Sequence, residues 1–303
     1  MLRVKVIYNP KANHARNTQL ADELRQLTTK RGGVDWSTTE YAGHAAELSM
    51  QAARAGYDLL LSVGGDGTLH EVINGLMQVE PDMRPSVGIV PAGSGNDFVR
   101  GTNRDLTPVL AINRAFDADD VKSMDVGYAR FDDGSAQYWE NVLGIGFDAA
   151  VNLHSMHLGW LPGKAMYFVA AVETIIKNYD APMLELIIDG HLSRQHVQML
   201  TIGNGPREGG SFITTPASKI DDGLLDYAMF DPVSRPMMVR LIPEVMRGTH
   251  GRFKQVHLGT CSTISLTADR PLLVHTDGEM VATTQSNVRK IEIGIKPAAI
   301  KLV

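Results

Sequence analysis

The sequence predicts an α/β domain with a doubly wound parallel sheet, followed by an antiparallel β-sandwich domain. In about the first 125 residues, short apolar runs alternate with helical patterns, which is the order of βαβ units. From about Met124 the chain instead shows strand-like runs joined at Asp133-Gly134 and Asp189-Gly190, pairs that are typical of hairpin turns. We therefore expect domains at 1–125 and 126–295, with the apolar end, 296–303, returning to the first domain.

Each expected element follows from a local pattern of apolar residues. In the first domain we expect strands at 3–10, 34–41, 58–63 and 86–93, and helices at 17–32, 44–56, 69–76 and 106–116. In the second domain we expect strands within 124–147, 183–205, 262–280 and 288–296, interrupted by one helix at 161–180.

Composition restricts the class of protein. The 303 residues are 44% hydrophobic and 21% charged, which is the profile of a soluble globular protein. A net charge of −5 argues against a nucleic-acid partner. The single cysteine, Cys261, excludes an intramolecular disulfide and fits a reducing compartment, and no apolar run reaches the roughly 20 residues that span a bilayer. We expect a cytoplasmic protein without a transmembrane segment.

Three glycines surround one aspartate in the stretch LLLSVGGDGTLHEVINGL, Leu59 to Leu76. A buried strand precedes them, and a helical pattern begins after them. Glycine lets a ligand approach the backbone, and the unpaired N–H groups at a helix start suit phosphate. Asp66 would repel a bare phosphate, so it fits if a divalent cation lies between them or if it orients a hydroxyl. An ordinary tight turn is the alternative.

A second loop of similar design follows the next strand, in GIVPAGSGNDFVRG. Here Gly93-Ser94-Gly95 precedes Asn96-Asp97, and helix capping alone would account for these two polar residues. Two phosphate-compatible loops that each carry an aspartate are harder to explain as ordinary turns. Because ligands bind at the carboxyl ends of parallel strands, we expect both loops and Asn9 on one edge of the sheet.

These motifs closely resemble the diacylglycerol kinase catalytic domain of bacterial lipid kinases. The resemblance rests on GGDGTLHEVINGL and PAGSGNDFVR, and it continues in Asn9-Pro10, GIGFDA, IDDGLLDYAMF and HTDGEM, nearly from end to end. The superfamily includes sphingosine and ceramide kinases and is distantly related to NAD kinases and phosphofructokinases, whose α/β fold the first domain is expected to share. Two positions depart from the family pattern: Asn13 stands where glycine is common, and Ser94 replaces the usual threonine.

The resemblance implies a kinase that transfers the γ-phosphate of ATP to a lipid hydroxyl, most simply of diacylglycerol or a related lipid, in the cleft between the domains. It places ATP against Asn9, Thr39, Gly64, Gly65, Asp66, Gly67, Thr68, Leu69 and Ser94. Asp66 would face the catalytic Mg²⁺ or its waters, in a network with Asp97 and Asp125. For Asp125, a solvated turn residue is an equal alternative.

A second, structural Mg²⁺ is also implied by the resemblance. It would be bound by Asp222 with backbone oxygens of Lys219 and Leu224, although the same residues could form only a hairpin turn. The resemblance assigns Glu279 as the base that accepts the hydroxyl proton, with Asp66 as the competing base. Asp277 is interpreted as a turn residue.

Two other functions stay open: a kinase of a soluble acceptor, similar to NAD kinases, and a nucleotide-binding regulator without catalysis. The expected partner is a lipid substrate at the inner face of a membrane, contacted peripherally, and the family allows a homodimer. The apolar residues of 165–177 are interpreted as core in preference to a lipid entrance. The preceding Trp160-Leu161-Pro162-Gly163 is the better candidate for contact with a membrane interface.

Overall fold

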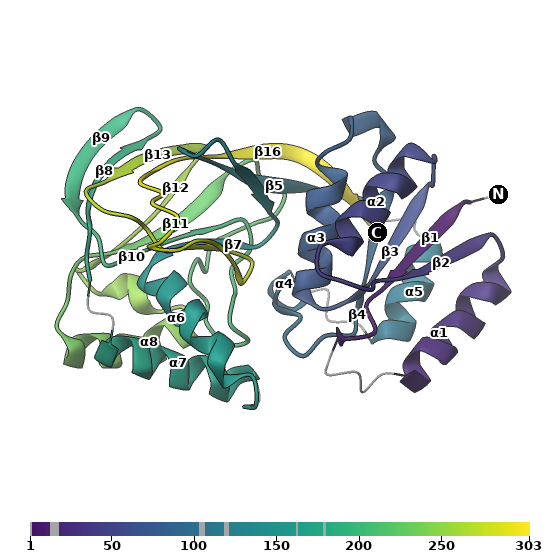
Figure 1. Cartoon of the computed structure of the whole chain (residues 1–303), viewed down its shortest axis with the longest axis horizontal. Helices are drawn as coiled ribbons and strands as arrows, with labels where there is room; N and C mark the ends of the chain where they lie inside the picture. Colours follow the sequence, from purple (N-terminus) through teal and green to yellow (C-terminus); the bar gives the residue numbers. More distant parts are fainter. Residues whose placement is uncertain (1, 13–17, 103–106, 118–120, 162, 178–179) are drawn as a thin grey trace. The chain divides into compact units, whose positions relative to one another are not determined.

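The computed structural model describes residues 2–12, 18–102, 107–117, 121–161, 163–177 and 180–303 (Figure 1). The chain divides into two compact units, of which one is Met1–Val126 with Pro297–Val303 and the other is Gly127–Lys296. Strands β5 and β16 each have residues in both units.

The first unit is built on a parallel sheet with the strand order β2-β1-β3-β4. The strands are β1 (Val4–Tyr8), β2 (Val34–Thr38), β3 (Leu59–Gly64) and β4 (Ser86–Pro91). The end of β16 (Lys290–Leu302) continues this sheet beside β4, where Leu302 lies opposite Val87. β3 is buried at every position, as expected of a parallel strand covered on both faces.

Helices cover both faces of this sheet (Figure 1). They are α1 (Thr18–Arg31), α2 (His44–Arg54), α3 (Asp66–Leu76), α4 (Asp97–Gly101) and α5 (Pro108–Phe116), with a short 3₁₀ turn, η2, at Pro81–Met83. Helix α2 packs on α3, and α1 packs on α5. This is the α/β architecture that the alternating pattern predicts.

The second unit contains two antiparallel sheets. One has the order β12-β11-β10-β7-β14-β15. The other has the order β16-β13-β8-β9, and β5 pairs with β16 and with β6. The strands not yet named are β5 (Lys122–Phe131), β6 (Ala136–Trp139), β7 (Val142–Gly146), β8 (Met183–Ile188), β9 (His191–His196), β10 (Met199–Gly203), β11 (Leu225–Phe230), β12 (Val256–Cys261), β13 (Thr263–Ala268), β14 (Val274–Thr276) and β15 (Glu279–Ala282). Side chains of both sheets share one apolar core, so the β-sandwich class is confirmed.

The hairpins of the second unit form where Asp-Gly pairs predict them. β8 and β9 are joined at Asp189 and Gly190, which have φ values of 44° and 85°. Two successive residues with positive φ make a type I′ turn, which suits the twist of a two-residue hairpin. β5 and β6 pair on either side of Asp133-Gly134.

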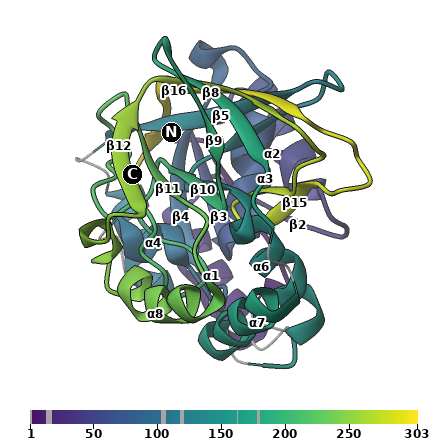
Figure 2. The same cartoon turned by 90° about the vertical axis from the view of Figure 1, so that its left-hand side faces the viewer.

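Three helices pack together in the second unit and lie side by side in Figure 2. They are α6 (Phe147–Ser155), α7 (Gly163–Lys177) and α8 (Arg235–Met246), accompanied by the 3₁₀ turns η3 (Met156–Leu158) and η4 (His250–Arg252). The expectation of a single helix here was wrong, because it missed α6 and α8. Pro236 in the first turn of α8 is a good start signal, but Pro243 interrupts the helical pattern further on. Pro162, expected near the start of α7, lies outside the described residues.

Candidate active site

The carboxyl edge of the parallel sheet gathers the loops that the sequence singles out. Parallel register places Tyr8 opposite both Thr38 and Val63, and Gly64 opposite Pro91, so these strands end in line. Three backbone hydrogen bonds continue the alignment beyond the strands: Asn9 N to Val63 O at 2.9 Å, Thr39 N to Tyr8 O at 2.9 Å, and Ala92 N to Gly64 O at 2.7 Å. The first loop, the second loop, Asn9 and Thr39 therefore lie on one edge, as predicted for a ligand site.

The two glycine loops touch through their backbones at Gly65 and Gly93. A Cβ atom on Gly93 would lie 2.4 Å from the Cα of Gly65, and one on Gly65 would lie 3.1 Å from the Cα of Gly93. Side-chain carbon atoms essentially never approach backbone as closely as the first of these distances. Glycine is thus required for the loops to meet and for their peptide groups to be open to a ligand.

Asp66 joins the first loop to the second. It is the first residue of α3, and its Oδ1 accepts a hydrogen bond of 3.2 Å from the backbone N–H of Phe98 at the start of α4. A Cβ atom on Gly95 would lie 2.9 Å from Asp66 Oδ2 and 3.8 Å from Asp97 Oδ2. The carboxylates of the two loops therefore converge on one glycine. Hard oxygen donors in this arrangement fit Mg²⁺, which binds few carboxylates and keeps several waters.

Asn96 shapes the second loop and is not a side-chain cap of α4. Its φ is 52°, and its side-chain amide accepts from Gly93 N at 3.1 Å and donates to Gly93 O at 3.0 Å. Capping, the alternative explanation of the Asn-Asp pair, therefore does not account for Asn96. The side chain closes the turn that presents Gly93 to Gly65.

Thr68 and Asn9 support the first loop through a side-chain hydrogen bond. The Asn9 Nδ2 group donates a hydrogen bond of 2.9 Å to Thr68 Oγ1, and the Thr68 side chain is buried. A Cβ atom on Gly64 would lie 2.3 Å from the same Oγ1, so the threonine fills the space that this glycine leaves. Thr68 Oγ1 is the acceptor of this hydrogen bond, so its own O–H group can still donate to a phosphate. Ser94, by contrast, is exposed on the second loop.

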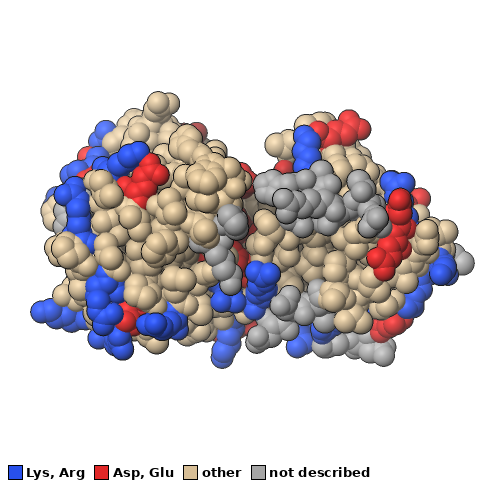
Figure 3. All heavy atoms as spheres, turned by 90° about the horizontal axis from the view of Figure 1, so that it is seen from below, with Lys and Arg blue, Asp and Glu red and all other residues tan. Residues whose placement is uncertain are grey.

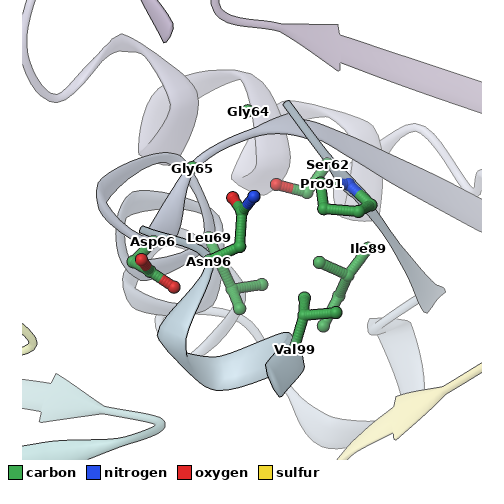
Figure 4. Close-up of a pocket in the computed structure, with 9 residues that line it drawn as sticks. All are labelled: Ser62, Gly64, Gly65, Asp66, Leu69, Ile89, Pro91, Asn96 and Val99. Carbon is green, nitrogen blue, oxygen red and sulfur yellow. The ribbon is translucent and has the colours of Figure 1, made fainter. Parts of the chain in front are cut away.

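A small pocket lies between these loops (Figure 4). Asp66, Asn96 and Ser62 supply its polar groups, and its apolar lining includes Leu69, Ile89 and Val99. Leu69 is buried, and its backbone N–H donates to Gly65 O at 3.2 Å.

Asp125 is a buried strand residue. It lies in β5 with 2% of its surface exposed, and its Oδ1 accepts a hydrogen bond of 2.7 Å from the N–H of Ala298, whose φ is 49°. The alternative of a solvated turn residue was wrong. Asp125 holds the returning end of β16 in the first unit, and a role in the metal network stays a prediction.

In the second unit, the motif TDGE forms a tight hairpin turn between β14 and β15. Asp277 and Gly278 have φ values of 50° and 90°, which confirms Asp277 as a turn residue. The Asp277 carboxylate accepts three backbone hydrogen bonds, from Glu140 N at 3.2 Å, Asn141 N at 3.0 Å and Val142 N at 2.9 Å. Glu279 then begins β15 with its side chain exposed.

Two residues that the sequence did not single out also hold this turn. Asn152 Nδ2 on α6 donates to Gly278 O at 2.6 Å, and Gly278 N donates to His275 Nδ1 at 3.3 Å. For Asn152, the sequence signal was the GIGFDA motif, which leads into α6. Asn152 lies 126 residues before Gly278, so spacing along the sequence does not reveal this partner.

His275 also faces two carboxylates. Its Nε2 lies 3.6 Å from Asp148 Oδ2 and 3.6 Å from Glu208 Oε2, and the three groups are close enough to surround a cation. A histidine ligand normally donates its other ring N–H to a hydrogen-bond acceptor. Here Nδ1 accepts from Gly278, so Nε2 carries the hydrogen of the neutral ring and is directed at the carboxylates. The cluster fits an internal hydrogen-bond network better than a metal site.

The segment IDDGLLD forms a turn before β11. Asp222 Oδ1 accepts from Leu224 N at 3.1 Å across Gly223, whose φ is 74°. Burial, and then the charge of Asp222, raises the pKa of the Asp226 carboxyl to about 6. Asp222 and Lys219 are exposed, and the carboxylate and carbonyl oxygens of this turn are donors of the kind that Mg²⁺ prefers.

An α/β sheet with two touching glycine loops and converging carboxylates is the arrangement expected of a kinase. Residues 3–129 match the diacylglycerol kinase catalytic domain, and residues 141–303 match the YegS C-terminal NAD kinase beta sandwich-like domain. The chain belongs to the bacterial diacylglycerol kinase-like family of lipid kinases, as its motifs predict. It is therefore an enzyme, a kinase whose acceptor is an alcohol group.

Relatives match the chain over most of its length. It is 28% identical to a diacylglycerol kinase of Mycobacterium tuberculosis, over 99% of this chain and 94% of the relative. It is 25% identical to a diacylglycerol kinase of Bacillus subtilis, over 92% of this chain and 90% of the relative. The crystal structure of a diacylglycerol kinase from Bacillus anthracis, 22% identical, has the same fold, with a TM-score of 0.72 over 99% of this chain and 96% of that chain.

No helix among the described residues is both long and apolar enough to cross a membrane.

Proposed function

We propose that this lipid kinase transfers the γ-phosphate of ATP to the free hydroxyl of diacylglycerol, with Mg²⁺ as its metal. The observation that carries the proposal is the meeting of the two glycine loops at Gly65 and Gly93, with the carboxylates of Asp66 and Asp97 beside Gly95. Phosphoryl transfer depends mainly on positioning and on neutralising charge on phosphate oxygens, and this edge offers backbone donors together with metal ligands. The names of the bacterial relatives support diacylglycerol as the acceptor.

The proposal assigns roles to residues at the sheet edge. The peptides of Gly64, Gly65 and Gly67 and the start of α3 would bind phosphates, with Asn9, Thr39, Thr68, Leu69 and Ser94 completing the nucleotide site. Asp66 and Asp97 would hold the catalytic Mg²⁺, which supplies charge neutralisation when bound, and Asp125 would belong to the same acidic network. Thr68 would donate its hydroxyl hydrogen to a phosphate while its oxygen accepts from Asn9.

Glu279 is proposed as the base. Its carboxylate is exposed at the first position of β15, and the rigid turn before it fixes the backbone from which it extends. Asp66 is a poorer candidate, because one of its oxygens accepts the Phe98 N–H and the other lies beside Gly95, where a metal is proposed. A structural Mg²⁺ on Asp222 and the carbonyl oxygens of Lys219 and Leu224 completes the proposal.

Product analysis tests the function. The native protein is supplied with ATP, Mg²⁺ and, in separate detergent-micelle reactions, diacylglycerol, a sphingoid base, a glycolipid and an isoprenoid alcohol; NAD is tested in solution. The proposal expects phosphatidic acid from diacylglycerol, and no product when Mg²⁺ is chelated. Phosphorylation of NAD without any lipid would instead establish a kinase of a soluble acceptor. ATP binding with no transfer to any acceptor would indicate a regulator.

A further inference from the structure

Helix α7 has two apolar faces, of which only one is covered. Ala170, Ala171 and Ile175 are buried against α6 and α8. On the other side Phe168, Val169 and Ile176 are 47%, 40% and 66% exposed. The interpretation of the apolar stripe as core is therefore wrong for Phe168, Val169 and Ile176, although the opposite face of the helix is buried.

The exposed residues of α7 form one continuous stripe. Because successive helical residues turn by about 100°, Ala165, Phe168, Val169, Val172 and Ile176 fall within an arc of roughly 100°. Ala165 is exposed, whereas Val172 is partly buried and packs against the core beneath the stripe. Two more apolar side chains, Met156 and Trp160, are 67% and 77% exposed in the connection that leads into this helix. Scattered exposed apolar residues need no explanation, but a contiguous stripe indicates a binding surface.

Positive charge lies next to this stripe. Arg235, at the start of α8, donates from Nε to the carbonyl oxygen of Ile175 at 3.0 Å and from Nη2 to that of Ile176 at 3.5 Å. Its guanidinium is thereby held at the end of α7, beside the most exposed residue of the stripe. The contact fixes the two helices to each other and places one cation beside the stripe.

The positive charge extends along α8 and the segment after it. Residues 235–254 contain five Lys and Arg residues and a single acidic residue, Glu244, a net charge of +4 in a chain whose net charge is −5. Glu244 is buried and pairs with Arg240 at 3.0 Å and with Arg252 at 2.6 Å, so these two arginines are only partly neutralised. Arg247 and Lys254 are exposed, and in the described part of the chain neither has an ion pair. Figure 3 views this side of the second unit, at the left, where blue spheres outnumber red ones around a tan surface.

We propose that the α7 stripe and the α8 cations form a docking surface for an anionic lipid bilayer. The apolar stripe would enter the boundary between headgroups and acyl chains, and the basic residues would attract anionic headgroups. Peripheral membrane helices bind through the same two interactions. Trp160 suits the same boundary, because its ring is amphipathic. The inference rests on the proposed function, in which the acceptor is a lipid held in a membrane. A protein partner would not require a stripe and a basic margin in this combination, whereas a bilayer surface offers both chemistries.

Vesicle sedimentation tests the surface with paired variants. Phe168→Ser with Ile176→Ser removes the stripe, and Arg247→Gln with Lys254→Gln removes exposed charge without breaking an observed ion pair. Leu192→Ser with Arg194→Gln, on the exposed strand β9, is the matched control. Vesicles are made of phosphatidylcholine alone or of phosphatidylcholine mixed with phosphatidylglycerol, and the thermal unfolding of each variant is recorded to confirm that it is folded.

We expect the native protein to bind the anionic vesicles, and we expect high salt to weaken this binding. Loss of the two cations should weaken this binding by about 30-fold. Loss of the two apolar side chains should weaken it by about tenfold or more. The control pair should bind like the native protein. If the stripe variant is unfolded, the charge pair alone decides.

Three results would overturn the docking surface. The first is that the native protein does not bind anionic vesicles, and the second is that neither pair of substitutions changes binding. The third is a dimer in solution that is dissociated by Phe168→Ser with Ile176→Ser, which would assign the stripe to a second copy of the chain. Transfer to diacylglycerol in detergent micelles is measured with the native protein in parallel. Its absence there would refute the proposed function and leave the vesicle result to decide the docking surface by itself.

Discussion

Gly65 and Gly93 stand so close that a single methyl group on Gly93 would lie 2.4 Å from the Cα of Gly65. Two loops that are separate in the sequence are thereby held as one backbone surface. Asp66 strengthens the contact between the loops, because its carboxylate accepts a hydrogen bond from the Phe98 N–H of the second loop. The site is thus defined by a backbone contact as much as by its side chains, and this contact can be tested directly.

Gly93→Ala should separate the loops. The added carbon meets backbone, which cannot move aside as a flexible side chain can, so we expect ATP affinity to fall at least about tenfold and the free energy of unfolding to fall by about 1–3 kcal/mol. Isothermal titration with ATP and Mg²⁺ and chemical denaturation measure the two effects. Gly159→Ala is the control, because a Cβ atom there meets nothing within 4 Å. Unchanged ATP affinity in Gly93→Ala would show that the nucleotide does not use the joined loops.

Asp66→Asn should strongly reduce the catalytic rate while leaving a folded protein. The amide keeps an oxygen that can accept from Phe98, but it removes the negative charge proposed to bind metal, so kcat should fall by about 100-fold or more. Initial rates over a range of Mg²⁺ concentrations measure the effect. Asp82→Asn, at an exposed aspartate of the same unit, should behave like the native enzyme. A variant with native kcat at saturating Mg²⁺ would remove Asp66 from the metal site.

Asp277→Ala should loosen the turn that carries Glu279. Three backbone N–H groups lose their charged acceptor, and alanine is disfavoured at a φ of 50°, so we expect a loss of about 2–4 kcal/mol in stability. Because Asp277 acts here as a positioning residue, kcat should fall while the affinity for ATP stays unchanged. Asp277→Asn, which retains an acceptor oxygen and tolerates this φ, should restore part of kcat. Equal loss of ATP affinity and kcat in the alanine variant would point to general unfolding.

His250 should make stability depend on pH. Its ring is buried, stacks on Phe230 and hydrogen-bonds through Nε2 to Thr214 O, and burial lowers its pKa. The unfolded state therefore protonates the His250 ring more readily than the folded state does. The stabilisation of the folded protein by the neutral ring is complete above the ordinary pKa of about 6.5, and it is lost as pH falls below that value. Denaturation of the native protein and of His250→Gln across this range measures the slope, which the variant should reduce. The exposed His191→Gln should keep the native slope, and an equal slope in all three proteins would contradict the assignment.

Local patterns predicted much of the fold and of the site. The all-apolar run before the first loop gave strand β3, and Asp-Gly pairs gave the turns at 189–190 and 277–278, because these signals depend on neighbouring residues alone. Helix α8 was missed, because Pro243 breaks a periodic pattern that tertiary packing nevertheless stabilises.

Other features depend on partners far along the chain. Asp125 is buried because it binds the N–H of a residue 173 positions away, and nothing near Asp125 indicates that partner. The exposed face of α7 was interpreted as core for a related reason. A sequence shows that a helix has apolar residues, but only the neighbouring elements decide which of them are covered.

The central claim is tested most directly by transfer of labelled γ-phosphate from ATP to diacylglycerol in detergent micelles. Native enzyme and Glu279→Gln are compared, with Glu292→Gln, an exposed glutamate of the same unit, as the control. The account predicts labelled phosphatidic acid from the native enzyme and the control, and a rate lower by about 10²-fold or more in Glu279→Gln with ATP still bound, since the amide cannot accept the proton. Transfer by Glu279→Gln at the native rate would contradict the assigned base, and native enzyme that binds ATP yet labels no diacylglycerol would contradict the proposed reaction.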